Sequence, residues 1–296
     1  MSDTLPILHP DADAPRFSAA DGLAPREIAG ATDVGKERER NEDHFMVAEL
    51  DRWLYVLQSS LIEQTDSVRA GGTEAVLLAV ADGIGGHAGG DMASAVVLDA
   101  LLHYTGLIMP WFGQQDRDAE ARIGAELAAA VRSCQERLFD VARRMKLSGG
   151  QPGTTLTAAY LTGRSLLVLH VGDSRCYRLR DGQLERLTRD HTLAQEIADS
   201  QGLAPETAEQ SPYAHILSNA VGGSDDDVRP EVAAFDLAPG DTILLCTDGL
   251  HGQVSDAEIA AVLGRAPEAS AACAELIRRA NADRGRDNVT AIVARY

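Results

Sequence analysis

Three apolar segments of this sequence end in an aspartate that is followed by a small residue suited to a turn, and these pairs are Asp82-Gly83, Asp173-Ser174 and Asp248-Gly249. A fourth aspartate, Asp287, precedes the last apolar segment, and the acidic group Asn41-Glu42-Asp43 follows Asp33 near the start. Carboxylates that converge at strand ends are partly desolvated, so their mutual repulsion must be relieved by protons or by cations. The pattern therefore predicts a cluster of acids that requires positive charge.

A divalent metal ion is the simplest source of that charge. The available ligands are oxygen atoms, and no set of cysteines or histidines has the spacing of a zinc site, so Mg²⁺ or Mn²⁺ is favoured over Zn²⁺. Each Asp-Gly pair taken alone is also an ordinary turn, and this alternative stays open. The turn alternative explains less well why Asp82, Asp248 and Asp287 all stand next to predicted strands.

Two glycine-rich segments resemble nucleotide-binding motifs without matching them. Residues 30–36 have the glycines and the lysine of a phosphate-binding loop, but Glu37 stands where a serine or threonine would hold Mg²⁺. Residues 83–88 fit a loose dinucleotide-binding pattern, but no strand with a terminal acid follows about 20 residues later. An NAD-binding oxidoreductase therefore has little support as an alternative.

Strands and helices must bring the acids together. Short apolar, β-branched runs predict strands over residues 76–81, 155–161, 165–171, 241–247 and 288–294. Tight turns at residues 162–164 and at Asp181-Gly182 predict antiparallel neighbours. Apolar residues three or four apart predict helices over 91–104, 123–145 and 269–282, and Ser255 with Glu258 forms a capping box that starts another. Strands in meanders with helices grouped between them indicate an α+β fold.

Composition excludes several classes of protein. The 27 Lys and Arg residues stand against 45 Asp and Glu residues, and the resulting formal charge of −18 disfavours nucleic-acid binding. No stretch has the roughly 18 uninterrupted apolar residues of a membrane span, and the N-terminus lacks the basic start of a signal peptide. We therefore expect a cytoplasmic protein whose four cysteines are buried thiols.

The domain organisation follows from the same survey. Residues 1–25 contain four prolines and no periodicity, which predicts a flexible leader. Beyond them there is no long linker and no internal repeat. Residues 26–296 are therefore predicted to form one domain.

A series of short motifs occurs in a characteristic order. They are TDVG at residues 32–35, Arg38, NED at 41–43, VADGIGGH at 80–87, GTT at 153–155, GDSR at 172–175, LSNAVG at 217–222, CTDGL at 246–250 and DNVT at 287–290. In this order they resemble the metal-dependent Ser/Thr protein phosphatases of type 2C, especially the bacterial branch. The resemblance covers about residues 28–296.

This resemblance implies a four-layer α/β/β/α sandwich of two antiparallel sheets flanked by helices, with two Mn²⁺ or Mg²⁺ ions at one end. It implies that Asp82 binds both ions and that the Gly83 carbonyl binds the first. Asp248 and Asp287 are expected to bind the second ion. The strand-end acids found independently agree with this placement.

The resemblance also implies roles around the metals. Asp33, Glu42 and Asp43 are expected to orient metal-bound waters, which tunes a metal site. Arg38, four residues before Glu42, matches the arginine that grips the substrate phosphate. Asp173 is expected to be a turn residue whose carboxylate caps backbone N–H groups, and it is left out of the metal ligands.

Two positions depart from the family's pattern. Some relatives carry a general-acid histidine two residues after the bridging aspartate, but Ile84 stands there, so another group or water must protonate the leaving group. Bacterial members often supply an aspartate for a third metal five residues before the GTT motif, but Ser148 occupies that position, so a third site is not carried over. The other histidines are scattered, and structural roles are expected for His44, His170, His191, His215 and His251.

The implied function is hydrolysis of phosphoserine and phosphothreonine in proteins by metal-activated water. The expected partners are phosphorylated proteins, namely Ser/Thr kinases and their substrates, and the expected enzyme is a monomer. Residues 189–225 correspond to the family's flap beside the active site. The alternative from another class is a catalytically weak pseudophosphatase that binds a phosphoprotein, which retention of Asp82, Asp248 and Asp287 opposes.

Overall fold

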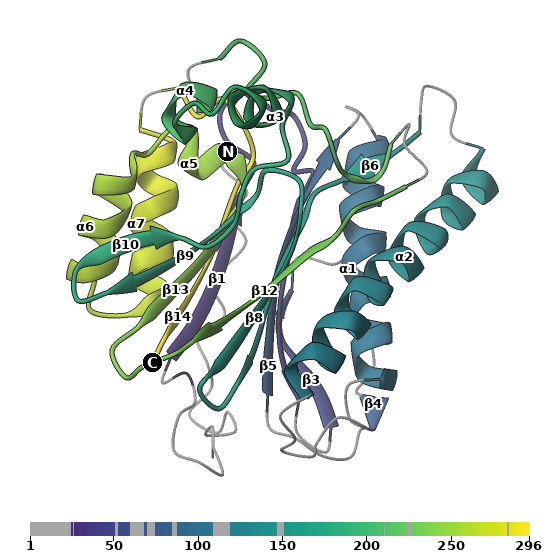
Figure 1. Ribbon diagram of the computed structural model, residues 1–296, viewed down its shortest axis with the longest axis horizontal. Helices are drawn as coiled ribbons and strands as arrows, with labels where there is room; N and C mark the ends of the chain where they lie inside the picture. The colour runs from purple at the N-terminus through teal and green to yellow at the C-terminus, as the bar shows by residue number, and fades with distance from the viewer. Residues whose placement is uncertain are drawn as a thin grey trace.

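The computed structural model describes residues 25, 27–50, 53–59, 68–69, 75–84, 88–108, 119–146, 151–209, 211–223, 227–282 and 284–296. The predicted leader except Pro25, the glycine-rich turn at 85–87 and Ser148 lie outside these residues. Two antiparallel sheets face each other, and helices cover the outer face of each (Figure 1). The predicted α+β class and the four-layer sandwich are confirmed.

The smaller sheet has five described strands, each antiparallel to its neighbours. In spatial order they are β1 (Glu27–Asp33), β14 (Val289–Arg295), β13 (Thr242–Cys246), β9 (Arg175–Arg180) and β10 (Gln183–Arg186). Helices α6 (Asp256–Arg265) and α7 (Ala269–Ala280) pack on its outer face. Because β1 pairs with β14 along its whole length, strands from opposite ends of the chain are neighbours.

The larger sheet stands against helices α1 (Ala88–Ile108) and α2 (Ala119–Met145). Its main strands are, in spatial order, β12 (Glu231–Asp236), β8 (Ser165–Val171), β7 (Leu156–Thr162), β5 (Ala75–Ile84), β2 (Asp43–Leu50), β3 (Trp53–Ser59) and β4 (Val68–Arg69). Two short strands, β6 (Gly153–Thr154) and β11 (Val221–Gly222), pair with each other, and β6 also pairs with the end of β5.

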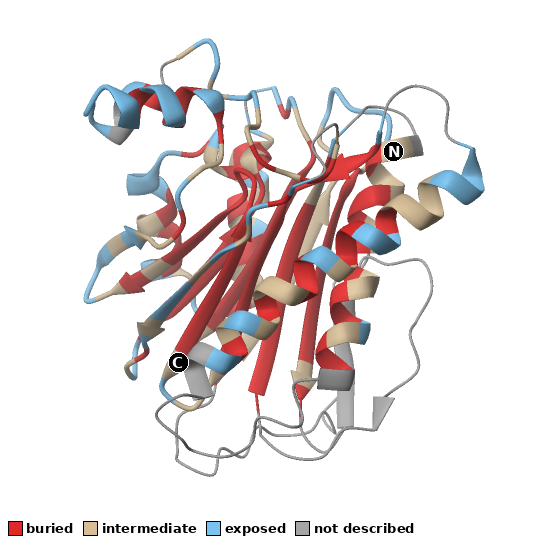
Figure 2. Ribbon diagram, turned by 45° about the vertical axis from the view of Figure 1, so that its right-hand side comes forward, coloured by how far each residue is buried: buried red, intermediate tan, exposed pale blue. Residues whose placement is uncertain are grey.

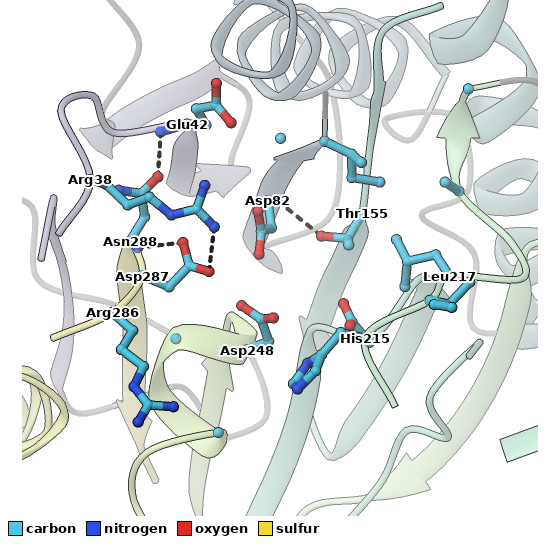
Figure 3. A pocket seen from close by; sticks show the side chains of 18 of the residues that line it. Arg38, Glu42, Asp82, Thr155, His215, Leu217, Asp248, Arg286, Asp287 and Asn288 are labelled. Carbon is cyan, nitrogen blue, oxygen red and sulfur yellow. Dashed lines mark hydrogen bonds and ion pairs between the residues drawn. The ribbon is translucent and has the colours of Figure 1, made fainter. Parts of the chain in front are cut away.

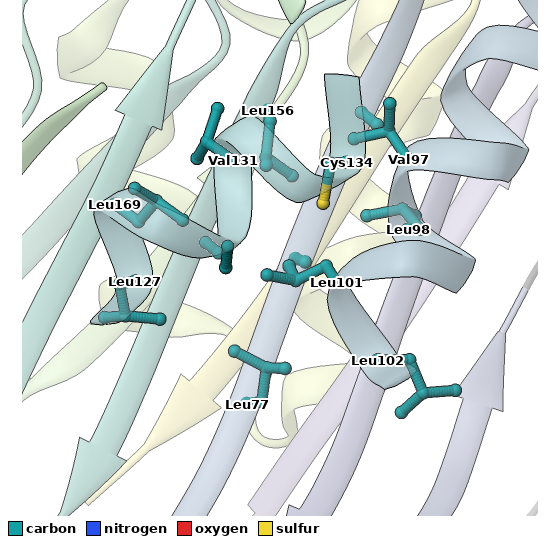
Figure 4. Close-up of a cluster of buried hydrophobic side chains, with 14 of the residues drawn as sticks. Leu77, Val97, Leu98, Leu101, Leu102, Leu127, Val131, Cys134, Leu156 and Leu169 are labelled. Atoms are coloured by element: carbon teal, nitrogen blue, oxygen red, sulfur yellow. The ribbon is translucent and has the colours of Figure 1, made fainter. Parts of the chain in front are cut away.

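The period-two pattern of the strands divides the core into layers. Along β5, Leu77 and Ala79 join the apolar cluster beneath α1 and α2, whereas Leu78 and Val80 join the cluster between the sheets. Figure 2 shows the buried strands, and Figure 4 shows side chains of the α1 and α2 cluster around Leu101. A third cluster lies between the smaller sheet and α6 and α7. The two packed sheets therefore form the framework that supports the residues at the strand ends.

The local predictions agree closely with the structure. The five predicted strands correspond to β5, β7, β8, β13 and β14, and the predicted helices to α1, α2, α6 and α7. Ser255 and Glu258 form the capping box at α6, and Asp181 and Gly182 both have positive φ, as a type I′ turn requires. All four cysteines are buried and free.

The described segments contain no helix that is both long and apolar enough to cross a membrane. The chain between β10 and β12 forms the flap segment, which contains α3 (Leu193–Ser200), α4 (Pro205–Glu209) and the loop leading to β11. Helix α5 (Asp248–His251) is a single turn that follows β13. The flap segment and α5 lie at the same end of the sandwich (Figure 1).

Candidate active site

Five aspartates gather at one end of the sandwich, because neighbouring antiparallel strands present opposite ends at the same edge. Asp43 opens β2 directly opposite Asp82 near the end of β5. Asp173 follows β8, Asp248 follows β13, and Asp287 precedes β14. The strand-end pattern therefore brings acids from across the sequence together.

Four of these aspartates, all except Asp43, line a cavity of about 960 Å³, and Figure 3 shows Asp82, Asp248 and Asp287 around it. Of the predicted site residues, six line it, namely Arg38, Glu42, Asp82, Gly83, Asp248 and Asp287. Asp43 is buried next to Asp82 behind the cavity wall. Asp33 is not among the lining residues, since its Oδ1 accepts hydrogen bonds from the Gly35 amide at 2.8 Å and the Asn281 amide at 2.9 Å.

The GTT motif holds the Asp82 backbone in place. The Asp82 carbonyl accepts hydrogen bonds from the Thr155 amide at 2.9 Å and the Thr154 hydroxyl at 2.8 Å. The Asp82 amide donates to the Thr155 hydroxyl oxygen at 2.9 Å. The carboxylate thus projects from a backbone that is fixed on both sides.

Two glycines that follow aspartates have no room for a side chain. A Cβ on Gly83 would lie 2.2 Å from the Gly90 carbonyl oxygen, and one on Gly249 would lie 1.8 Å from the Asn288 carbonyl oxygen. These glycines let α1 and β14 approach the aspartates closely. The Asp-Gly pairs therefore serve packing at the cavity as well as turning the chain.

Asp43 is held by two hydroxyl groups beside the smaller sheet, one from Thr247 directly after β13 and one from Thr290 near the start of β14. Its Oδ2 accepts hydrogen bonds from Thr247 and Thr290, each at 2.7 Å. Burial, partly offset by these two donors and reinforced by the neighbouring acids, raises the pKa of Asp43 to about 7. The other oxygen, Oδ1, is buried and has no hydrogen-bond partner among the described residues.

The other aspartates of the cluster repel one another in the same way. Burial and the negative charges of neighbouring aspartates raise the pKa values of Asp82 and Asp173 well above their ordinary range. Burial and the charge of Asp287 raise the pKa of Asp248, and Asp248 Oδ1 also lacks a hydrogen-bond partner among the described residues. Within the described residues, no ion pair with lysine or arginine neutralises Asp82, Asp173 or Asp248, and the pKa values of these aspartates stay raised.

Asn288 connects the loop that carries Arg38 to the start of β14. Its side-chain oxygen accepts from the Glu42 amide at 2.8 Å, and its side-chain nitrogen donates to the Val34 and Arg40 carbonyls, each at 2.9 Å. Arg38 Nη2 donates to Asp287 Oδ2 at 2.8 Å, and this hydrogen bond raises the pKa of Arg38. The Arg38 side chain remains half exposed at the cavity.

Sequence reasoning did not assign several residues of the site. Asp173 was expected to cap a turn, but it lines the cavity and interacts electrostatically with Asp82 and Asp248. The roles of Thr247 and Asn288 were also missed. The one indication in the sequence that Thr247 and Asn288 belong to the site was their position inside the CTDGL and DNVT motifs.

The histidine expectation holds for four residues and is wrong for one. His44 contacts Ser94, and ring nitrogens of His170, His191 and His251 all have hydrogen-bond partners. Burial lowers the pKa of His251 to about 3, so this ring is a neutral structural group. His215 is exposed and lines the cavity, because the flap segment carries it over the aspartates.

The donor set fits hard divalent cations. Asp43 and Asp248 each have a carboxylate oxygen without a hydrogen-bond partner among the described residues, and their pKa values are raised. A bound cation would stabilise both carboxylates. Within the described residues, no three Asp, Glu, His or Cys side chains enclose an ion by themselves. Mg²⁺ and similar ions bind through one or two carboxylates and retain several waters, so a site shared by few side chains suits them.

Comparison with known proteins agrees with this geometry. The sequence model described as Protein phosphatase 2C matches residues 60–293, which is most of the chain. This chain belongs to the protein phosphatase 2C family. The predicted family resemblance is therefore confirmed, and the further comparisons concern members of that family.

Serine/threonine protein phosphatase PstP of Mycobacterium tuberculosis is 39% identical over 230 residues, which are 77% of this chain and 41% of PstP. The chain thus matches about two fifths of the length of that relative. Staphylococcus aureus Stp1, a serine/threonine phosphatase, superposes with a TM-score of 0.74 at 26% identity, over 96% of this chain and 99% of Stp1. The PstP catalytic domain in complex with two manganese ions superposes with a TM-score of 0.67 at 32% identity, over 91% of this chain and 97% of that domain.

Proposed function

We propose that this protein phosphatase 2C family member is a Mn²⁺- or Mg²⁺-dependent phosphatase that hydrolyses phosphoserine and phosphothreonine in proteins. The observation that carries the proposal is the cluster of mutually repelling buried aspartates around one cavity, with Arg38 at its edge. The names of Stp1 and PstP as serine/threonine phosphatases, and the two manganese ions of the PstP domain, support it.

In this proposal, Asp82 and the Gly83 carbonyl would hold one ion, and Asp82, Asp248 and Asp287 would hold the second, in each case together with water molecules. When bound, the two ions lower the pKa of a water molecule and neutralise charge that develops on the phosphoryl group. Thr154 and Thr155 keep the Asp82 backbone fixed, so its carboxylate direction does not depend on the ligand. Glu42 and Asp43 orient waters at the ions, and Asp33 acts through the loop it braces.

Arg38 is the phosphate-binding residue of this proposal. Its guanidinium group lies at the cavity edge, half exposed, in a loop held by Asn288. A guanidinium group keeps its charge and presents several donors to phosphate oxygens. Its present bond to Asp287 shows that the group reaches the cluster.

The proposed partners are phosphorylated proteins, including Ser/Thr kinases and their substrates, and the proposed setting is the cytoplasm, where the enzyme acts as a monomer. The net charge of −18 supports the prediction that nucleic acid is not a partner. The family's flap, here α3, α4 and the following loop, lies beside the cavity and supports a role in substrate choice.

The test is hydrolysis of p-nitrophenyl phosphate and of a phosphothreonine peptide, first in EDTA and then with Mn²⁺ or Mg²⁺. We expect turnover only with metal and a loss of at least about 10³-fold in Asp248→Asn, because that carboxylate is a proposed ligand. Asp236→Asn, an exposed aspartate on β12, is the matched control and retains activity. A folded, metal-loaded protein without turnover would contradict the proposal and favour the pseudophosphatase.

A further inference from the structure

One imidazole lines the cavity among the described residues, and it belongs to His215 in the loop after α4. The side chain is exposed, and no hydrogen-bond partner for its ring lies in the described part of the chain. The other five described histidines each have a ring nitrogen in a hydrogen bond, and they are His44, His103, His170, His191 and His251. His215 is thus the histidine whose ring is available to a ligand.

The ring stands beside the acids without being paired to them. His215 and Asp248 both line the main cavity and an adjoining cavity of about 300 Å³, and the two residues interact electrostatically. Figure 3 shows the His215 ring on the far side of Asp248 from Asp287. No ion pair joins His215 to Asp248 among the described contacts. The ring therefore borders the space where a substrate phosphate would sit, with its nitrogens free.

The other groups around the cavity are poor proton donors for a leaving alkoxide. Ile84, two residues after Asp82, is apolar and 38% exposed. The hydrogen bond to Asp287 raises the pKa of Arg38, so its guanidinium group does not give up a proton.

Among the carboxyl groups that line the cavity, those of Asp82, Asp248 and Asp287 are proposed metal ligands. Glu42 is proposed to orient metal-bound water, and Asp173 is buried beside Asp248. A phosphatase acting on serine phosphates needs a donor, because the alkoxide of serine is a far worse leaving group than p-nitrophenolate.

We infer that His215 is the general acid of the reaction, delivered to the cavity by the flap segment. This inference rests on the proposed phosphatase function. Water forms the new bond to phosphorus, and the bond from phosphorus to the substrate oxygen breaks with its electron pair remaining on that oxygen. The proton on the His215 imidazolium moves to the same oxygen and releases the neutral serine or threonine. The water's proton goes to solvent, from which the imidazole is protonated again.

The test compares leaving groups in the full-length, Mn²⁺-loaded protein. In His215→Gln we expect kcat for a phosphoserine peptide to fall by about 10²-fold or more, which is the usual contribution of a general acid. The loss with p-nitrophenyl phosphate should be far smaller, because p-nitrophenolate leaves without protonation. His103→Gln, at an exposed histidine on α1, is the matched control and should reduce neither rate. In His215→Gly, added imidazole should restore part of the peptide activity.

The possible results distinguish the proposed phosphatase function from the proposed role of His215. Wild-type protein that hydrolyses neither substrate would defeat the proposed function itself. Equal losses on both substrates, or no loss on the peptide, would overturn the role of His215 while leaving the phosphatase intact. Loss of Mn²⁺ binding by His215→Gln in calorimetry would also overturn it, since the residue would then be a metal ligand.

Discussion

Two groups of charged residues, each containing buried members, lie side by side at this end of the molecule, and they are neutralised in opposite ways. In the first, Arg175 donates to both oxygens of Asp190 at 2.7–3.2 Å and to Glu209 at 2.9 Å. Burial acts to raise the pKa of Asp190, but the hydrogen bonds and charge of Arg175 hold it below its ordinary value. In the second, Asp43, Asp82 and Asp248 face one another, and their pKa values are raised.

The difference teaches where each group obtains its positive charge. The arginine group is complete within the chain, so it stabilises the fold under any conditions that keep its acids ionised. Among the described residues, no lysine or arginine forms an ion pair with Asp43, Asp82 or Asp248, and the pKa values of these acids stay raised although Arg38 lies nearby, so their charge balance depends on protons or metal from solution. The adjoining cavity of about 300 Å³ touches both groups, since Arg175, Asp190 and Asp248 all line it. The arginine group and the aspartate group therefore differ in the source of their positive charge, although they lie close together.

The largest expected effect on stability comes from breaking the arginine group. Removing one partner of a buried ion pair typically costs about 3–5 kcal/mol, because the other charge is left buried without compensation. Arg175→Met, at a side chain only 6% exposed, should therefore lower the free energy of unfolding by about that amount in urea denaturation. Asp190→Leu added to Arg175→Met should recover much of the loss. A single variant as stable as wild type would show that the pair is not needed.

Metal binding should stabilise the aspartate group by a smaller amount. A ligand that binds only the folded state at about 100 times its Kd adds about 2.7 kcal/mol to the free energy of unfolding. We expect Mn²⁺ to raise the Tm of the wild-type protein and to have little effect on Asp248→Asn. Arg175→Met should still respond to Mn²⁺, because its cation is not part of the aspartate group. An equal rise of Tm in Asp248→Asn would contradict the proposed ligand set.

The pH dependence of stability should differ between the two groups in metal-free protein. The pKa of Asp43 is about 7 in the folded state against 3.8 ordinarily, so the folded protein binds the extra proton and Asp43 favours folding at low pH. That contribution is lost as pH rises through about 7. Asp190 has the opposite sign, since its lowered pKa gives stability that is lost as pH falls below its ordinary value.

Urea denaturation in EDTA between pH 5 and pH 8 measures this effect. The free energy of unfolding of wild-type protein should decline across this range, and the decline should be shallower in Asp43→Asn, which cannot titrate. Saturating Mn²⁺ should flatten the wild-type curve. The same slope in Asp43→Asn and in wild type would assign the pH dependence to other groups.

The smallest effect is expected far from both groups. Ser255 caps α6 through its hydroxyl and belongs to the capping box with Glu258. Ser255→Ala should cost about 1 kcal/mol of stability, the usual cost of losing a cap, with phosphatase activity and the response to Mn²⁺ unchanged. A change in Mn²⁺ response in this variant would show that the aspartate group is sensitive to general loosening of the fold.

Local pattern was enough to predict much of the fold. The strands and helices followed from periods of two and three or four residues, which report which faces are buried. The acids at the strand ends could also be anticipated, and the packing of the two sheets brings Asp82 near the end of β5 and Asp248 after β13 to the same end of the sandwich. The resemblance then placed Arg38 and Asp287 beside them, and both line the cavity.

Contacts between distant segments were beyond such reasoning. The two hydroxyls that hold Asp43 come from residues 204 and 247 positions away, so no local signal identifies them. The direction in which a loop side chain points also cannot be predicted from the sequence. For that reason His215 was expected to be structural and Asp173 to be a turn residue. Both depend on how the flap segment and the two sheets meet in space.

The pairing of β1 with β14 has a consequence for the order in which the protein can become active. Arg38 lies just after the first strand, and Asp287, Asn288 and Thr290 lie at the start of the last. A growing chain on the ribosome could assemble β2, β5, β7 and β8, whose pairings with one another lie within the first 171 residues, before β12 is made to pair with β8. It could not fix the Arg38 loop or supply Asp287 until residues 287–295 had emerged. Under the proposed function, the nascent chain should therefore be inactive, and dephosphorylation should begin only after β14 has paired with β1.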